Sequence, residues 1–487
     1  MTDTSSGRTP APADGSDEAP LGPAVKVAAV AALGGFLFGY DSAVINGAVS
    51  AIEKVFSVES ASLGFAVASA LLGAAAGAIG AGKFADRFGR LMAMRLAAVL
   101  FLVSALGAGF APSLWILIVF RLVGGLGVGI ASVIAPAYIA EIAPASIRGR
   151  LGSLQQLAIV TGIFISLLVD YLFASSAGGS TETFWLGLAA WRWMFLAMAV
   201  PAIIYGVLSL TIPESPRHLI ATYKIPEARR VLRTMLGGKG IEVRIQRIKE
   251  SLEHDKPPSW ADLRAPGTGL LPIVWVGIAL SVFQQFVGIN VIFYYSNVLW
   301  EAVGFSESDS FKITVITAVV NIVTTLVAIA SVDRFGRKPL LVIGSIGMAV
   351  SLGVMSVVFS IARTVTDAGG HVTPVLDGAQ GPIALVAANL FVVAFGMSWG
   401  PVVWVLLGES FPNRIRAAAL SLAAAAQWVA NWLITVSFPK MKDISLGLAY
   451  GFYALCALLS LFFVLKWVQE TKGKELEDMG EQAFSGH

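Results

Sequence analysis

Charged residues are scarce in this chain. They account for 13% of its 487 residues, whereas hydrophobic residues account for 56%. A soluble domain usually carries about twice that share of charge, so the composition excludes one large soluble globule. It fits a chain that is surrounded by lipid, because hydrocarbon does not solvate charges.

Cysteine and histidine are also rare. The single cysteine, Cys456, excludes a disulfide framework and a cysteine metal site, and no two of the four histidines share a metal-ligand spacing. We recognise no phosphate-binding loop and no nucleophile–base pair, so we expect no metal, no cofactor and no enzymatic activity. The charge pattern offers no basic surface for nucleic acid.

Long apolar stretches occupy most of the chain. A bilayer-crossing helix needs about 20 apolar residues. Such stretches fall near residues 25–50, 61–82, 91–111, 113–140, 151–173, 192–211, 269–300, 311–332, 339–361, 380–407, 414–437 and 446–468. We therefore predict an all-α membrane protein with twelve transmembrane helices, in two six-helix halves at 25–211 and 269–468.

The remaining segments are polar. Residues 1–24 are predicted to be a disordered cytoplasmic tail, and residues 469–487 a second cytoplasmic tail. Residues 212–268 are predicted to be a cytoplasmic linker with short amphipathic helices near 225–236 and 241–253.

Lys and Arg alternate between the loops. They gather in the loops after even-numbered spans, as at Lys83, Arg87 and Arg90, and the intervening loops are poorer in them. The positive-inside rule makes the basic loops cytoplasmic. We expect a multi-pass protein of the cell membrane with both termini in the cytoplasm.

Two loop motifs occur once in each half. "DRFGR" stands at 86–90 and 333–337, and Glu-x-x-Pro-x-x-x-Arg stands at 141–148 and 409–416. Two pairs in register indicate a duplicated six-helix unit. Their charges could form an ion-pair network that acts as a cytoplasmic gate, or could serve only as topology anchors. The residues are Asp86, Arg90, Glu141, Arg148, Asp333, Arg337, Glu409 and Arg416.

Amides and Trp residues cluster inside the apolar spans. Amides suit the hydroxyls of a sugar because each donates and accepts, and Trp suits its flat face. Amides also join membrane helices, but their number here favours a cavity. Gln285 and Asn290 could face one ligand only if the helix were unwound near Gly288. Tyr294 or Tyr295 could then close over the ligand.

Asp41 lies in the first apolar stretch, within "GGFLFGYDSAVING". A charge at the bilayer centre costs at least about 2.5–3.5 kcal/mol, so Asp41 needs a partner, a proton or a water-filled cavity. The obvious partner is Arg121 in the fourth span. A static structural ion pair is the plainer alternative.

The motifs together resemble the sugar porter family of the major facilitator superfamily, closest to bacterial proton-coupled glucose and xylose symporters. The resemblance rests on "GGFLFGYD", "DRFGR" twice, "PESPR" at 213–217, "QQFVGIN" at 284–290 and "GPVVWVLLGESFPNRIR", and it spans about residues 28 to 478. The last family motif, "ETKGKELEDM", departs by having Gln469 where the family usually has Pro.

The resemblance implies roles for individual residues. It makes Asp41 the proton carrier and Arg121 its partner, where passive facilitators usually have Asn in place of the Asp. It assigns sugar contacts to Gln156, Gln284, Gln285, Asn290, Asn321, Trp399, Gln427 and Trp428. Phe38, Ile163, Tyr294 and Asn431 could line the same cavity.

We therefore expect a secondary transporter that imports a monosaccharide with a proton by alternating access, functional as a monomer in the lipid bilayer. The apolar Ile163 favours D-glucose over D-xylose. A D-xylose–proton symporter, a passive facilitator and a non-transporting sugar sensor remain as alternatives.

Overall fold

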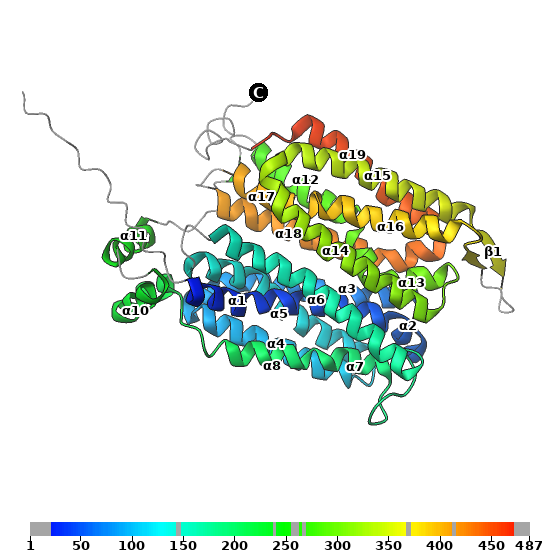
Figure 1. Cartoon of the computed structure of the whole chain (residues 1–487), viewed down its shortest axis with the longest axis horizontal. Coiled ribbons are helices and arrows are strands. Elements are labelled where there is room, and N and C mark those ends of the chain that lie inside the picture. The colour runs from blue at the N-terminus through cyan, green and yellow to red at the C-terminus, as the bar shows by residue number, and fades with distance from the viewer. Residues whose placement is uncertain are drawn as a thin grey trace, which may run out of the picture.

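The computed structural model describes residues 21–142, 148–236, 240–254, 263–264, 269–366, 372–411 and 415–471. The chain forms a bundle of long helices in two halves, the N-terminal half below and the C-terminal half above in Figure 1. Within the described residues, twelve helical segments are long and apolar enough to cross a membrane. They confirm the predicted all-α architecture and fall at the predicted places.

The N-terminal half contains the first eight helices. They are α1 (Leu21–Ala43), α2 (Ile45–Phe56), α3 (Ser60–Phe88), α4 (Arg90–Gly109), α5 (Leu114–Ile142), α6 (Arg148–Ala177), α7 (Ala190–Ala197) and α8 (Ala199–Leu208). Three short helices follow: α9 (Pro216–Ala221), α10 (Ile225–Leu236) and α11 (Ile241–His254). The helices α10 and α11 match those predicted for the linker, and α10 contacts α9 and the start of α1.

The C-terminal half repeats the pattern. Its helices are α12 (Pro272–Phe286), α13 (Ile289–Ala302), α14 (Glu307–Phe335), α15 (Arg337–Ile361), α16 (Gln380–Gly396), α17 (Trp399–Ser410), α18 (Arg416–Ile444) and α19 (Leu446–Trp467). A small antiparallel hairpin, β1 (Arg363–Thr366) and β2 (Val372–Val375), joins α15 to α16, with Arg363 opposite Val375. Sequence reasoning did not predict this hairpin.

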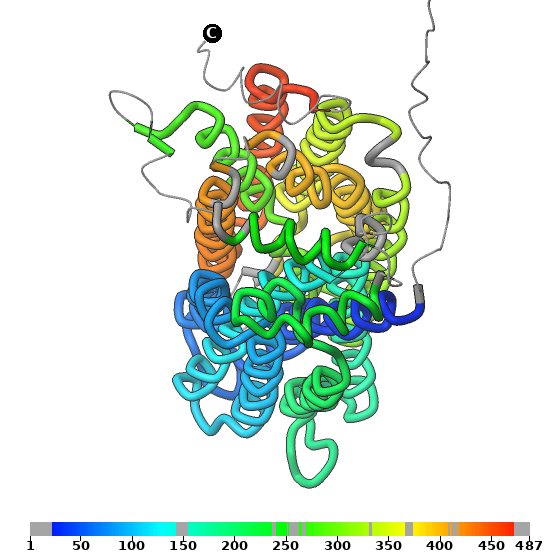
Figure 2. The backbone as a smooth tube through the Cα atoms, turned by 90° about the vertical axis from the view of Figure 1, so that its left-hand side faces the viewer, coloured from blue at the N-terminus to red at the C-terminus, as the bar shows by residue number. Residues whose placement is uncertain are grey.

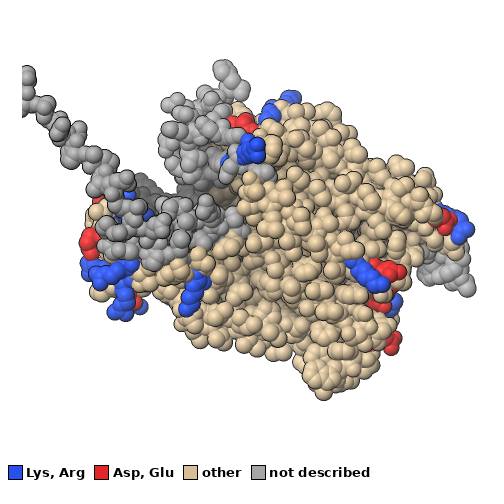
Figure 3. All heavy atoms as spheres, viewed as in Figure 1, with Lys and Arg blue, Asp and Glu red and all other residues tan. Residues whose placement is uncertain are grey.

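The two ends of the bundle differ. One end, here called the hairpin end, carries β1, α2, α7 and α13; the other, the linker end, carries α10 and α11 (Figure 1). Viewed from the linker end, α10 and α11 lie across the front of both halves (Figure 2). Charged side chains gather toward these two ends, with an uncharged band between them on the face shown in Figure 3.

Small residues let helices of the N-terminal half approach closely. An ideal Cβ on Gly125 of α5 would lie 2.0 Å from the Ala70 carbonyl oxygen of α3, and one on Gly129 would lie 2.1 Å from that of Ala74. Gly39 of α1 and Gly162 of α6 pack equally closely, against the carbonyls of Ile159 and Phe36. Packing of this kind replaces the hydrophobic effect inside a membrane, and it joins α5 to α3 and α6 to α1, the helix that carries Asp41.

Candidate functional site

Asp41 and Arg121 lie together in the core of the N-terminal half. Arg121 Nη1 lies 3.5 Å from Asp41 Oδ1 and donates a 2.8 Å hydrogen bond to the Asp41 carbonyl oxygen. The two side chains are 1% and 3% exposed. The structure thus brings the predicted pair together, and its role in proton coupling stays a prediction.

A small cavity adjoins this pair. Asp41, Ser42 and Arg121 line it from the N-terminal half, and Tyr294 lines it from α13 of the other half. Its volume is about 10 Å³, on a scale where one water molecule needs about 10–15 Å³. Within the described part of the chain, neither Asp41 carboxylate oxygen has a hydrogen-bond partner. The carboxylate can therefore take a proton without breaking a hydrogen bond.

The seventh span is broken where the amide pattern predicted. Gly288 separates α12 from α13 and has a φ of 83°, a left-handed conformation that glycine adopts readily. A Cβ at this position would also lie 2.8 Å from the Tyr453 ring. The break confirms the prediction of an unwound helix and places Asn290 within reach of Gln285.

A chain of amides runs through the break. Asn290 Nδ2 donates to Gln285 Oε1, Gln285 Nε2 to Gln284 Oε1 at 3.4 Å, and Gln284 Nε2 to the Trp399 carbonyl at 2.8 Å. The chain links the break in the seventh span to the start of α17. Such neutral groups can exchange their partners for sugar hydroxyls.

Other predicted sugar-contacting residues lie on α18 and α1. Trp428 packs against Phe38 across the two halves, with ring centroids 6.1 Å apart. Gln427 Oε1 is buried without a hydrogen-bond partner among the described residues. Asn431 accepts a hydrogen bond from Thr435 at 3.1 Å and lies within reach of the Tyr294 hydroxyl.

The remaining members of the predicted set are less closely connected. Gln156 and Ile163 are partly buried on α6, and Asn321 is buried on α14. Trp399 is fully buried, and its indole N–H donates to Ser345 Oγ at 2.9 Å. In this arrangement the Trp399 indole packs α17 against α15 and its N–H is already in use.

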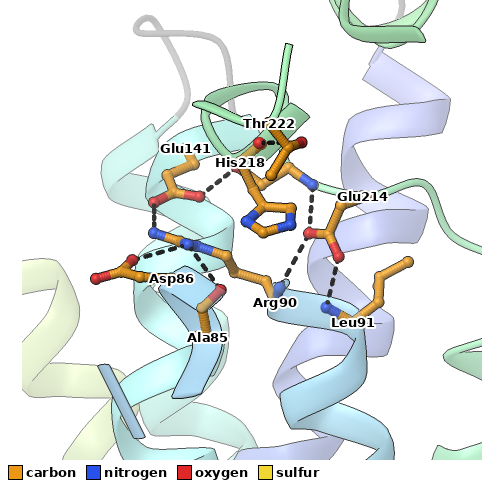
Figure 4. A network of polar contacts seen from close by, with 9 residues as sticks. Ala85, Asp86, Arg90, Leu91, Glu141, Glu214, His218 and Thr222 are labelled. Carbon is orange, nitrogen blue, oxygen red and sulfur yellow. Dashed lines mark hydrogen bonds and ion pairs between the residues drawn. The ribbon is translucent and has the colours of Figure 1, made fainter. Parts of the chain in front are cut away.

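Arg90 organises a polar network at the linker end (Figure 4). Its guanidinium contacts Asp86 at 3.0 Å and Glu141 at 2.9 Å. Glu214 accepts hydrogen bonds at 3.1 Å from the backbone N–H groups of Arg90 and Leu91, which begin α4. These contacts join α3, α4 and α5 to the start of the linker, and the role of the charges as a cytoplasmic gate stays a prediction.

In the C-terminal half an acid also accepts hydrogen bonds at the start of a helix. Glu470 accepts hydrogen bonds from the backbone N–H groups of Arg337 and Lys338, at 3.1 and 3.0 Å, where α15 begins. Sequence reasoning missed Glu214 and Glu470; the signal was an acid after the last span of each half, in "PESPR" and "QETKG". The side chains of four predicted gate residues lie outside the described residues: Arg148, Asp333, Glu409 and Arg416.

Several polar contacts between the halves lie at the hairpin end. Asn46 of α2 donates to the Phe293 carbonyl at 2.9 Å and accepts from the Asn297 N–H at 3.1 Å, both on α13. Ser50 donates to the Glu301 carboxylate at 3.2 Å. These residues escaped prediction because nothing in the sequence pairs α2 with α13. They close the hairpin end of the interface between the halves.

A second buried acid was also missed. Asp170 of α6 is 0% exposed, and its Oδ2 accepts a 3.2 Å hydrogen bond from the Gly47 N–H. Its Oδ1 has no hydrogen-bond partner within the described residues. The available signal was the lone acid in the fifth apolar stretch, in "LLVDYLF".

Comparison with known proteins agrees with this geometry. The model of the sugar (and other) transporter family matches residues 27–483. A glucose transport protein of Synechocystis sp. is 57% identical over 93% of this chain and 96% of its own length. The D-xylose-proton symporter of Escherichia coli K12 is 40% identical over 92% of this chain and 94% of its own.

A solved structure is also similar. The xylose transporter of E. coli in an inward-open conformation superposes with a TM-score of 0.80 at 37% identity, over 94% of this chain and 99% of that one. The match extends over both halves. The chain belongs to the sugar (and other) transporter family.

Proposed function

We propose that the chain imports D-glucose together with a proton across the cell membrane by alternating access. The observation that carries this proposal is the buried Asp41–Arg121 pair beside a cavity lined from both halves. The glucose transport protein that is 57% identical over 93% of the chain supports the choice of sugar. Transport, and not catalysis, is then the activity of the protein.

The linker end is proposed to face the cytoplasm. The basic loops after the even-numbered spans support this assignment, which also places both termini inside. Closure of the hairpin end by Asn46 and Ser50 then corresponds to an inward-facing arrangement. The likeness to an inward-open solved structure agrees with it. We propose that the protein works as a monomer, with 212–268 as a cytoplasmic linker between the two halves.

Asp41 is proposed to carry the proton. Arg121 favours the ionised form of the carboxylate beside it; when the cavity opens to the outside, water can deliver a proton to the carboxylate and weaken the pair. At about 100 mV, one proton is worth about 2.3 kcal/mol. That free energy can drive a neutral sugar against its gradient.

The sugar is proposed to bind beside the broken seventh span. Gln284, Gln285 and Asn290 already hydrogen-bond one another, and a sugar would replace part of that chain. Trp428 and Phe38 offer an apolar wall from opposite halves. Further contacts would come from Gln156, Asn321, Trp399 and Gln427, with Ile163, Tyr294 and Asn431 at the edges of the cavity.

Proton-coupled D-xylose import is the second candidate. The D-xylose-proton symporter that is 40% identical supports it. Both sugars offer the same ring of hydroxyls, and only the hydroxymethyl group of glucose distinguishes them. Ile163 on α6 is the residue that we propose favours glucose.

The test is uptake of labelled glucose and labelled xylose into proteoliposomes with an imposed pH gradient. We expect accumulation of glucose that disappears when the gradient and the membrane potential are collapsed. Asp41→Asn should abolish accumulation and keep equilibrium exchange of the sugar. Concentrative uptake by Asp41→Asn would refute Asp41 as the carrier, and stronger uptake of xylose would decide for the second candidate.

A further inference from the structure

The first span is interrupted locally between α1 and α2, where Val44 keeps helical dihedral angles and its N–H still donates to the Tyr40 carbonyl at 2.9 Å. Backbone groups at a break inside a membrane need other partners. Two neighbouring helices supply them. Arg121 of α5 donates to the Asp41 carbonyl at 2.8 Å, and Asp170 of α6 accepts from the Gly47 N–H at 3.2 Å. The break is therefore held by a cation on its carbonyl side and a carboxyl group on its amide side.

Asp170 is built into this position. An ideal Cβ on Gly47 would lie 2.6 Å from the Asp170 carboxyl carbon, so glycine makes room for the acid. The carboxyl group is wholly buried and its second oxygen has no partner among the described residues. The transport mechanism proposed above gives it no role.

Few charges surround Asp170. Tyr40 of α1 is the titratable side chain that interacts with it electrostatically. The arginines of the neighbouring helices α5 and α7 are engaged elsewhere: Arg121 with Asp41, and Arg192 with the carbonyls of Gly109 and Ala111.

The charges of α2, and those in the first turns of α14, lie toward the hairpin end of α6, whereas Asp333 and Arg334 stand in the last turn of α14 at the linker end. On α2, Lys54 and Glu53 interact with Glu301. On α14, Glu307 accepts from the Ser180 N–H and Asp309 pairs with Lys312. Within the described residues no cation pairs with Asp170, and an ionised carboxylate in such a site is costly. The neutral carboxylic acid suits this arrangement.

The helix that Asp170 holds closes the hairpin end. Asn46, the residue before Gly47, bonds both the carbonyl and the N–H of an i, i+4 pair on α13, Phe293 and Asn297. One turn further along α2, Ser50 bonds Glu301. The position of the break therefore sets whether α2 reaches the other half.

We propose that Asp170 is a second proton-holding carboxyl group of the transport cycle, which keeps its proton while the hairpin end is closed and releases it to water when that end opens. The step converts a carboxylic acid and a water molecule into a carboxylate and a hydronium ion. Asp170 acts as a positioning residue, through the break of the first span. Because proton binding and closure are linked, low pH then favours the closed hairpin end and high pH favours the open hairpin end.

The test reads opening directly in right-side-out membrane vesicles. The buried Cys456 is replaced by alanine, and Val49→Cys places a thiol on α2 one turn from Asn46. An impermeant maleimide reports its exposure at about pH 6 and about pH 8. Glu182→Cys, exposed in the loop before α7, corrects for the pH dependence of the reagent.

We expect the corrected labelling rate of the parent to rise about threefold or more between the two pH values, as one titrating group allows. Asp170→Asn keeps an acceptor for the Gly47 N–H but cannot titrate, so its rate should stay low and constant. Asp170→Leu removes the acceptor and should label quickly at both pH values. If that variant fails to fold, Asp170→Asn still decides the question.

The proposal rests on the proton-coupled transport cycle proposed above, but the labelling experiment does not depend on that cycle. A rise retained in Asp170→Asn, or absent from the parent, overturns the proposal. A rise lost in Asp41→Asn but kept in Asp170→Asn would assign the proton to Asp41. Failure of the proposed function shows separately, as sugar uptake that a pH gradient does not drive.

Discussion

Among the described residues, the polar contacts at the two ends of the bundle differ. At the hairpin end, Asn46 and Ser50 reach from one half to the other. Among the described residues of the linker end, Arg90 and Glu141 bond each other, Glu214 of the linker bonds the start of α4, and Glu470, after the last span, bonds the start of α15.

The difference follows from which contacts must break in each transport cycle. Contacts between halves have to form and separate, so a few hydrogen bonds serve better than a strong charged network. Contacts within a half persist through the cycle, so buried charges with several partners can stabilise it. The hairpin end is therefore the closed end in this arrangement, and the role of the linker-end charges as a cytoplasmic gate stays a prediction.

The largest effect is expected where the break in the seventh span positions α13. Gly288→Ala would place a Cβ in a left-handed conformation, at a cost of about 1–2 kcal/mol, and 2.8 Å from the Tyr453 ring. We expect sugar transport to fall to near background. The matched control is Gly353→Ala in α15, whose Cβ would meet nothing within 4 Å. Equal sugar transport by the two variants would show that the break at Gly288 has no role in the gate.

Asn46→Ala tests the contact between the halves directly. It removes two hydrogen bonds, each worth about 0.5–1.5 kcal/mol net. The open form of the hairpin end should therefore gain about tenfold in population. Maleimide labelling of the Val49→Cys reporter measures this.

Asn389→Ala is the matched control for Asn46→Ala. The Asn389 amide donates to the Leu385 carbonyl of its own helix, so the same chemical change touches no contact between the halves. Opening that increases equally in both variants would contradict the assignment of Asn46 to the gate.

Glu214→Gln and Glu470→Gln test the linker end in the two halves. Each carboxylate accepts from the first two N–H groups of a helix, so each loss should cost about 1 kcal/mol of stability. Thermal unfolding in detergent should show similar decreases for both. Neither should change labelling of the Val49→Cys reporter; a clear increase with either would make the linker-end charges part of the gate.

Sequence reasoning predicted the architecture because its signals are local. Twelve apolar stretches, the repeated "DRFGR" and the alternation of Lys and Arg need no knowledge of tertiary contacts. The break at Gly288 was predictable for the same reason, since two amides five residues apart cannot share a face of a regular helix. The pairing of Asp41 with Arg121 followed from the cost of an unpaired charge in lipid.

The contacts between helices were harder to predict. In the sequence, Asn46 is an ordinary amide and Glu214 an ordinary linker residue. Only the structure places α13 beside Asn46 and Glu214 at the start of α4. Asp170 carried the same signal as Asp41, an acid in an apolar stretch, but no arginine in the sequence was an obvious partner. The family motifs drew attention to the linker-end charges, and no motif marked the contacts of Asn46 and Ser50 that close the hairpin end in this arrangement.

The smallest effect is expected for Glu242→Gln, also at the linker end. Arg229 Nε lies 2.6 Å from Glu242 Oε1 between α10 and α11, and this hydrogen bond lowers the pKa of the Glu242 carboxylate. A lowered pKa in the folded state gives stability that is present at neutral pH and is lost as pH falls through that value. Both side chains are exposed, at 41% and 67%, so solvent screens the pair.

We therefore expect Glu242→Gln to leave the Tm unchanged at about pH 7 and at about pH 4. Glu214→Gln, measured beside it, should lower the Tm at neutral pH because its partners are backbone N–H groups that have no other acceptor at the start of a helix. Both variants remove one carboxylate from the same end of the molecule. A decrease for Glu242→Gln as large as that for Glu214→Gln would mean that charge at the linker end stabilises the protein, whatever its position.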